Sequence, residues 1–207
     1  MNKFLVVAAN GKAGQKIVTE LMARGLDVTV AVRQANKTQA SQVIIKDLFD
    51  LTAADVSNFD VVIDAFGAWA PEALPQHTSS LEHLAAILAP NSRLLVVGGA
   101  GSLYLDASHT AALKDSDGFP EAFKPLASAM GEGLARLRTL DVDWTYLSPA
   151  ADFVADGEKK GHYVIEGEVL TTDDKGVSQL SYADYATAVV DIATSGRYHR
   201  ERVSVRW

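Results

Sequence analysis

The 207-residue sequence contains no cysteine. Disulfide bonds, thiolate catalysis and zinc sites built on cysteine are therefore excluded. No apolar run approaches the roughly 20 residues that a membrane-spanning helix needs. The N-terminal stretch MNKFLVVAANGKAG also lacks the longer apolar run and the cleavage site of a signal peptide. We therefore expect a cytoplasmic protein with no membrane partner.

Basic residues are fewer than acidic ones: the sequence has 19 Lys and Arg and 26 Asp and Glu, which gives a formal net charge of −7. This acidic balance gives no support to nucleic-acid binding. The five histidines show no tight metal-ligand spacing, so we expect no metal site. No Gly-x-Ser-x-Gly sequence is present, which disfavours a serine hydrolase.

What the sequence does contain is an alternation of apolar runs and helical patterns, which is typical of a parallel sheet covered by helices. The pattern predicts strands at 4–9, 28–32, 43–45, 60–65, 93–97, 144–147 and 202–205. It predicts helices at 12–24, 81–88, 120–140 and 182–194, and a β-hairpin within 152–174. We expect an α/β fold: one Rossmann-type domain over residues 1–207, with a doubly wound parallel sheet and a small C-terminal substrate-side lobe at about 150–181.

A turn with the sequence Ala-Ala-Asn-Gly-Lys-Ala-Gly joins the first strand to the first helix. A dinucleotide diphosphate needs backbone N–H groups, little side-chain bulk and a helix N-terminus, all of which such a turn supplies. The alanine that opens the turn stands where a first glycine is common, and it is tolerated only if the turn does not require a positive φ. The alternative is an ordinary strand-to-helix turn. The residues expected to bind the cofactor here are Ala8, Asn10, Gly11, Lys12, Ala13 and Gly14.

The end of the second strand carries no acidic residue. NAD-specific sites place Asp or Glu there, to accept hydrogen bonds from the ribose hydroxyls. This sequence has Arg33 at the strand end and Lys37 four residues later. The arginine fork and the lysine charge suit a 2′-phosphate, although two solvated loop cations are the plain alternative. The sequence therefore favours NADP(H) over NAD(H).

Six stretches, in this order, carry a family resemblance: VVAANGKAGQKIV, VTVAVR, KDLFD, VVIDAFG, LLVVGGAGSL and DWTYLSPA. They resemble the atypical short-chain dehydrogenases, and more narrowly the NAD(P)H-binding proteins described as NADH-flavin reductases, relatives of the biliverdin reductase B type. The resemblance covers nearly the whole chain and is specific for the family, not for a substrate. It implies further cofactor contacts: Asp47 and Leu48 beside the adenine, Ala65, Phe66 and Gly67 along its ribose and the diphosphate, Gly98 and Gly99 near the nicotinamide ribose, and Ser148, Pro149 and Ala150 over the nicotinamide.

The Tyr-x-x-x-Lys pair of short-chain dehydrogenases is missing, because none of the six tyrosines has a lysine four residues later. Ordinary alcohol–ketone chemistry is therefore disfavoured. Ser102 and Lys124 are the candidate catalytic residues, each with an ordinary structural role as the alternative. Trp69, Phe66 and Phe153 are candidates to line a pocket for a planar acceptor, or else to pack the lobe.

Two functions are compatible with a sequence that keeps the cofactor-binding half of the domain and lacks the Tyr-x-x-x-Lys pair. The first is an NAD(P)H-dependent oxidoreductase that passes hydride from NADPH to a flavin or a similar planar small molecule, with the flavin as substrate. The second is a non-enzymatic NADP(H)-binding redox sensor with a regulatory role. The identity of the acceptor and the oligomeric state stay open at this point.

Overall fold

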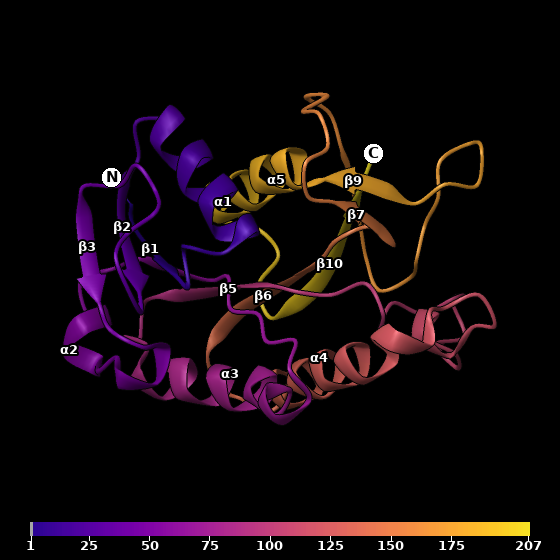
Figure 1. Ribbon diagram of the computed structural model, residues 1–207, viewed down its shortest axis with the longest axis horizontal. Helices are drawn as coiled ribbons and strands as arrows, with labels where there is room; N and C mark the ends of the chain where they lie inside the picture. The colour runs from indigo at the N-terminus through magenta and orange to yellow at the C-terminus, as the bar shows by residue number, and fades with distance from the viewer. Residues whose placement is uncertain (1) are drawn as a thin grey trace.

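An eight-stranded sheet forms the centre of the computed structural model, which describes residues 2–207, and its strand order is β3-β2-β1-β4-β5-β6-β10-β8 (Figure 1). Neighbouring strands in this sheet are parallel, except that β8 is antiparallel to β10. The strands are β1 (Lys3–Val7), β2 (Asp27–Val32), β3 (Gln42–Ile45), β4 (Val61–Asp64), β5 (Arg93–Val97), β6 (Asp143–Ser148), β8 (Val164–Glu166) and β10 (Glu201–Arg206). The order reverses between β1 and β4, so the expected doubly wound Rossmann-type fold is confirmed.

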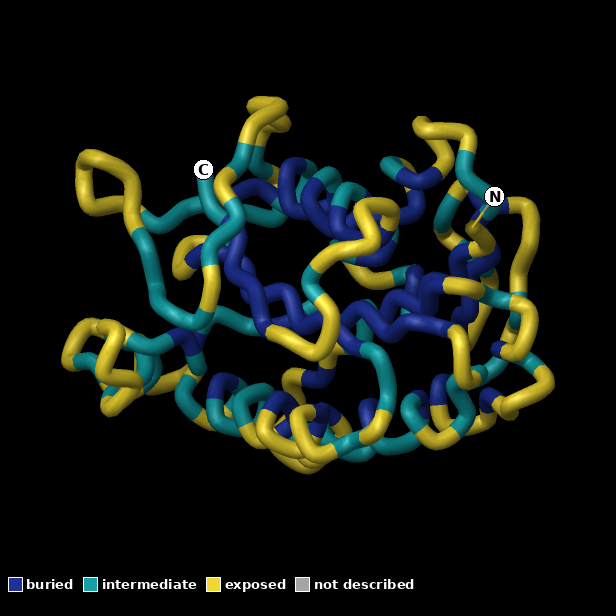
Figure 2. Tube along the Cα trace, turned by 180° about the vertical axis from the view of Figure 1, so that it is seen from behind, coloured by how far each residue is buried: buried dark blue, intermediate teal, exposed yellow. Residues whose placement is uncertain are grey.

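Helices cover both faces of the sheet. Helices α1 (Lys12–Ala23) and α5 (Tyr182–Ser195) pack together on one face, and α3 (Gln76–Ile87) packs with α4 (Lys124–Leu137) on the other (Figure 1). The central strands β1, β2, β4, β5, β6 and β10 are largely buried, while the edge strands β3 and β8 and most connecting loops are more exposed (Figure 2). The apolar runs in the sequence are continuous because successive side chains of each strand enter opposite, equally buried faces.

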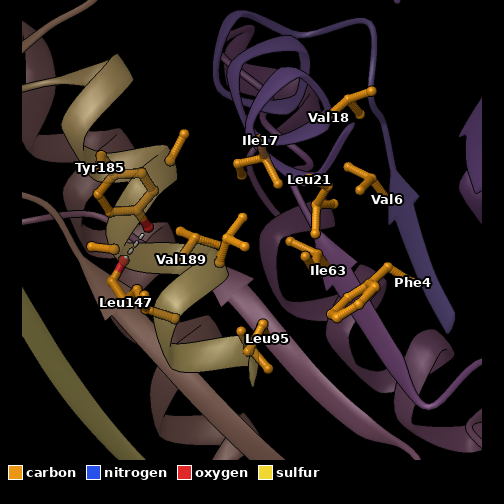
Figure 3. Packing of buried hydrophobic residues seen from close by; sticks show 14 of the residues in the cluster. Phe4, Val6, Ile17, Val18, Leu21, Ile63, Leu95, Leu147, Tyr185 and Val189 are labelled. Atoms are coloured by element: carbon orange, nitrogen blue, oxygen red, sulfur yellow. Dashed lines mark hydrogen bonds between the residues drawn. The ribbon is translucent and has the colours of Figure 1, made fainter. Parts of the chain in front are cut away.

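Two hydrophobic clusters result from this arrangement. On the α1 and α5 side, Ile17 and Leu21 pack toward Phe4 of β1, and the hydroxyl of Tyr185 donates a hydrogen bond of 2.7 Å to the carbonyl of Leu147 (Figure 3). On the other side, the inward faces of α3 and α4 cover the alternate strand residues. Loops follow the carboxyl ends of the parallel strands, and the candidate site lies on these loops.

The C-terminal lobe is built differently from the expected hairpin. Strand β7 (Asp152–Val154) pairs in parallel with β9 (Gln179–Ser181), and β8 joins the main sheet beside β10. The hairpin prediction within 152–174 is therefore wrong. Alternating polarity indicates a strand but does not identify its partner, and here the partners lie far away in the sequence.

Several helix boundaries also differ from the expectation. Helix α3 begins at Gln76 rather than at residue 81, and the predicted helix at 120–140 divides into a 3-10 turn, Glu121–Phe123, and α4. A short helix α2 (Ala53–Val56) and 3-10 turns at Leu48–Asp50, Pro71–Ala73 and Leu113–Asp115 were not expected. Among residues 2–207, no helix combines the length and the apolar character required to cross a bilayer.

Candidate functional site

The N-terminus of α1 opens directly from the glycine-rich turn. Gly11 is the N-cap residue, no side chain caps the helix, and its first turn holds no acidic residue. The first N–H groups of a helix have no partner within the helix, and they lie at the positive end of its dipole. This end of α1 is therefore free to bind an anion, as the turn sequence predicts.

Ala8 has a φ of 56°, in the left-handed region. The expectation that alanine is tolerated because the turn needs no positive φ is therefore wrong. The N–H of Gly11 donates to the carbonyl of Ala8 at 3.1 Å, and this short connection sets the turn. An L-residue in this conformation costs roughly 1–2 kcal/mol, which the surrounding fold must offset.

The two glycines of the turn have different surroundings. A Cβ at Gly14 would lie 2.8 Å from both Cα and the carbonyl oxygen of Ala9, so the missing side chain lets α1 approach the end of β1. A Cβ at Gly11 would meet only the carbonyl oxygens of Ala8 at 3.5 Å and Ala65 at 3.9 Å. Gly14 therefore serves packing, and Gly11 keeps the surface in front of the helix end clear.

Asn10 joins the turn to the loop after β2. Its Nδ2 donates to the carbonyl of Ala35 at 3.0 Å, and its Oδ1 accepts from the N–H of Lys37 at 2.8 Å. Through these bonds Asn10 holds the loop segment that carries Lys37 beside the start of α1. Lys12 is exposed and Ala13 half-buried in the first turn of α1.

Arg33 lies at the end of β2 with 79% of its side chain exposed, and its Nε is 3.9 Å from Oδ2 of Asp47. Asp47 also caps the following 3-10 turn, where its Oδ1 accepts from the N–H of Phe49. The structure therefore brings Arg33 and Asp47 together at the edge of the sheet that the carboxyl ends of the parallel strands form. Leu48, in contrast, places its side chain in the core, so that only its backbone faces this edge.

The remaining predicted cofactor residues also follow strands at this edge. Ala65 donates its N–H to the carbonyl of Val7 at 3.1 Å, and Gly67 is exposed. A Cβ at Gly98 would lie 2.1 Å from Cε1 of Tyr146, so a side chain there is excluded by packing. The segment at the end of β6 is buried and consists of Ser148, Pro149 and Ala150. The hydroxyl of Ser148 has no hydrogen-bond partner within residues 2–207.

A row of buried polar side chains crosses the sheet beneath this edge, and the sequence analysis did not identify it. Asp64 of β4 is aligned with Val96 of β5, Val96 with Tyr146 of β6, and Tyr146 with Arg202 of β10. Register partners point to the same face, here the face that α3 and α4 cover. The sequence carries one signal for the row, the acidic residue that ends the apolar run VVID. Tyr146 and Arg202 lie within predicted strands and carried no such mark.

Each member of the row holds one loop of the edge. Asp64 accepts from the N–H of Phe66 at 2.9 Å, and the hydroxyl of Tyr146 accepts from the N–H of Gly99 at 3.2 Å. Arg202 donates to Oγ of Ser102 at 3.2 Å. The loops expected to contact the cofactor are therefore fixed from below by buried hydrogen bonds, which are costly to break.

Arg202 is itself paired with Glu168, to which its Nε donates at 2.8 Å, while only 1% of the arginine side chain is exposed. Nη2 of Arg202 donates to the backbone carbonyl of Glu168 at 3.2 Å. Tyr104, in the loop after β5, bonds to the same part of the lobe. Its N–H donates to the carbonyl of Glu168, and its carbonyl accepts from the N–H of Leu170. The loop after β5 and the lobe are thus joined around the buried Arg202 side chain and the half-buried Glu168.

Burial changes the acidity of this row. It raises the pKa of Asp64 to about 6, against a smaller opposing effect of the Phe66 hydrogen bond, and it raises the pKa of Tyr146 to about 12. Burial also lowers the pKa of His77, which lies beside them. A cavity of about 10 Å³ lies between these three side chains, close to the space of one water molecule. Burial favours the protonated form of Tyr146, and the residue four positions after it is Ala150, not the lysine of a Tyr-x-x-x-Lys pair.

Asp64→Asn is expected to change how stability depends on pH. Because the pKa of folded Asp64 lies above the ordinary value of 3.8, the folded protein binds this proton more tightly than the unfolded chain does. Its contribution to stability is greatest below about pH 4 and falls by about 3 kcal/mol as the pH rises through about 6. Asn keeps an oxygen for Phe66 but does not titrate.

Urea unfolding between about pH 4 and pH 7.5 measures this difference. The variant should gain stability relative to the native protein as the pH rises, whereas Asp117→Asn, at an exposed position, should leave the pH dependence unchanged. Parallel pH profiles for the native protein and Asp64→Asn would show that Asp64 does not titrate in this range.

The two candidate catalytic residues have separate partners. Oγ of Ser102 receives its bond from Arg202, and Lys124, at the start of α4, forms an ion pair with Glu121. Among residues 2–207 the two side chains share no hydrogen bond or ion pair. They do not form a catalytic pair in this structure, although the Ser102 hydroxyl keeps its own proton to donate.

The three aromatic candidates fall into different environments. Phe153 stacks on Tyr182 with ring centroids 3.8 Å apart and packs the lobe. Phe66 meets His77 edge to face at 5.6 Å beneath the edge. Trp69 is 70% exposed on the loop after β4. Only Trp69 presents its ring to solvent beside the predicted cofactor residues.

Comparison with known proteins agrees with this geometry. The family model described as NAD(P)H-binding matches residues 8–195, from the glycine-rich turn to the end of α5. The chain belongs to this NAD(P)H-binding family. The family span includes the strands from β2 to β9 and all five helices, α1 to α5.

Relatives of this NAD(P)H-binding chain cover its whole length. A crystal structure of SP1627 from Streptococcus pneumoniae TIGR4, named "a putative NADH-flavin reductase", is 51% identical, with a TM-score of 0.97 over 100% of this chain and 99% of that one. The uncharacterized protein YwnB of Bacillus subtilis (strain 168) is 44% identical over 98% of this chain and 97% of its own length. A Burkholderia pseudomallei protein named as exported is 33% identical over the full length of both chains, with a TM-score of 0.87.

Within residues 2–207, no group of three or more His, Asp or Glu side chains is arranged to hold a metal ion. The polar groups of the edge are instead backbone N–H groups, hydroxyls, amides and single cations. This donor set suits a phosphate-bearing organic cofactor.

Proposed function

We propose that this protein transfers hydride from NADPH to a flavin or a similar planar acceptor. The observation that carries the proposal is the N-terminus of α1, where the N-cap residue is Gly11, no side chain caps the helix and the first turn has no acidic residue. A helix end of this kind favours a diphosphate. The relative named as an NADH-flavin reductase supports the same class of reaction.

In this proposal different residues of the edge bind different parts of the cofactor. The N–H groups of Lys12, Ala13 and Gly14 bind the diphosphate, and Arg33 with Lys37 binds the 2′-phosphate. The loops after β4, β5 and β6 bind the riboses and the nicotinamide end. The bound cofactor supplies the hydride, and the protein supplies position and an environment that excludes competing reactions.

No dedicated proton donor is needed for this reaction. A flavin accepts hydride on its own ring and spreads the charge over its π-system. Tyr146 has a pKa of about 12, and Lys124 is paired with Glu121. We therefore assign Ser102 and Lys124 supporting roles, and we place the reaction in the cytoplasm, where NADPH is supplied.

Stopped-flow mixing of NADPH-loaded protein with oxidised FMN, FAD and a series of quinones tests the proposal. We expect oxidation of NADPH, and we expect Ser102→Ala and Lys124→Ala each to slow it less than tenfold. An essential general acid contributes about 10²–10⁴-fold, so a loss of that size with unchanged NADPH binding would contradict the proposed chemistry. No oxidation with any acceptor would favour the redox-sensor function instead.

A further inference from the structure

We propose that Trp69 and Phe123 form the surface on which the planar acceptor stacks. This inference rests on the proposed function and names the part of the site that recognises the acceptor. The acceptor class is a neutral, fused aromatic ring system of the isoalloxazine kind.

The two rings meet although they lie far apart in the sequence. Trp69 belongs to the loop between β4 and the 3-10 turn Pro71–Ala73, and Phe123 ends the turn that precedes α4. Their centroids are 6.4 Å apart at an interplanar angle of 73°, an edge-to-face pair. The pair therefore joins the loop after β4 to the beginning of α4.

This pair lies against the predicted cofactor loop. Nε1 of Trp69 is 3.9 Å from the position that a Cβ on Gly67 would take. Gly67 follows the Phe66 N–H that the buried carboxylate of Asp64 holds. The position of the indole is thus linked to the loop that the resemblance places along the adenine ribose and the diphosphate. Phe123 connects the pair to the nicotinamide side, because it lies one helical turn before Ala127, whose Cβ is 2.5 Å from the position that a Cβ on Gly101 would take in the loop after β5.

Both rings keep open faces. Trp69 is 70% and Phe123 51% exposed, whereas Phe153 and Tyr182 stack face to face in the lobe. An edge-to-face pair covers one face of one ring, so the other ring faces stay available for stacking. A planar ligand would remove this apolar area from water and add aromatic contact, which single exposed aliphatic side chains do not offer.

The cations around the pair are already compensated. Lys124, next to Phe123 in the chain, pairs with Glu121, and Lys114 pairs with Asp115 at 3.0 Å. Lys124 also lies near enough to Asp115 to lower the pKa of that carboxyl, together with Lys114. A phosphate on the acceptor would find no unpaired lysine among these groups. We therefore expect the ring system, and not its phosphate, to determine affinity.

Trp69→Leu and Phe123→Leu test the proposal through binding rather than turnover. Riboflavin and FMN are titrated into NADP⁺-loaded protein, and flavin fluorescence reports the complex. We expect each variant to weaken the binding of both flavins by about tenfold, with similar affinities for riboflavin and FMN in the native protein. Binding of NADPH should stay unchanged, and Val164→Ala, an exposed apolar position on β8, should change neither measurement.

Tryptophan fluorescence gives a second readout. Of the three tryptophans, Trp69 is exposed, Trp207 half-buried and Trp144 buried. The part of the acrylamide quenching that Trp69→Leu removes therefore reports Trp69, and it should fall when riboflavin binds. Flavin affinities that are unchanged in both variants would overturn the proposal. Loss of a dimer in Trp69→Leu, measured by sedimentation with flavin affinity retained, would overturn it in favour of a second copy of the chain as the occupant.

The outcomes separate this inference from the proposed function. If the native protein binds riboflavin through Trp69 but does not reduce it, the reaction fails and the binding surface stands. If flavin reduction proceeds and neither variant affects it, the surface fails and the reaction stands. If the native protein binds no planar ring, both are overturned.

Discussion

Gly14→Val is expected to abolish dinucleotide binding and to destabilise the fold, while Gly11→Val abolishes binding in a folded protein. At Gly14 even a Cβ would lie 2.8 Å from the backbone of Ala9, so α1 must move away from β1. Overpacking of this kind costs typically 1–3 kcal/mol. At Gly11 the nearest atom is 3.5 Å away, and the branched side chain instead fills the space in front of the helix end.

Calorimetric titration with NADPH and thermal unfolding together measure these effects. We expect affinity to fall by more than about 100-fold in both variants, and the melting temperature to fall clearly only for Gly14→Val. Gly118→Val is the matched control, because a Cβ there has nothing within 4 Å. A folded Gly11→Val protein that keeps its NADPH affinity would refute the placement of the diphosphate.

Arg33→Ala is expected to weaken NADPH binding by about 10- to 100-fold and to leave NADH binding nearly unchanged. The guanidinium is 79% exposed, and its contact with Asp47 is loose at 3.9 Å, so the side chain is free to bind a 2′-phosphate. Charge-assisted hydrogen bonds to phosphate are among the stronger polar contacts in proteins. NADH has no 2′-phosphate and loses nothing.

Two further variants sharpen this measurement. Arg33→Lys keeps the charge but loses the two-donor fork, so its NADPH affinity should fall between those of Arg33 and Ala. Asp47→Asn removes the competing carboxylate and should increase the preference for NADPH. Equal affinities of the native protein for NADPH and NADH would contradict the assignment of Arg33 and Lys37.

Local sequence patterns predicted the sheet and the glycine-rich turn at the start of α1, because both depend on residues close together in the chain. The run FLVVAA indicated a strand buried on both faces, and Gly14 was expected to permit close packing of helix and strand. The structure confirms that packing by the position a Cβ would take, 2.8 Å from Ala9. Arg33 was likewise recognised from its place at a strand end.

Ala8 shows where local reasoning failed. Alanine rarely adopts a positive φ, so the residue type argued for an ordinary conformation, yet the φ is 56°. The conformation is set by the contact between the turn and the end of β1, and residue preference is the weaker effect. Similarly, Asn10 was expected only at the cofactor, whereas its side chain joins two loops.

By itself the sequence determined the fold class, the glycine-rich turn at the start of α1 and the absence of a Tyr-x-x-x-Lys pair, because each depends on residues close together in the chain. Only the tertiary structure decided the pairing of β8 with β10, the row of Asp64, Tyr146 and Arg202, and the contact of Trp69 with Phe123. These contacts join residues that are tens of positions apart. Their formation depends on strand order and register. Both are decided when the whole sheet assembles, so no single segment of the sequence carries a signal for them.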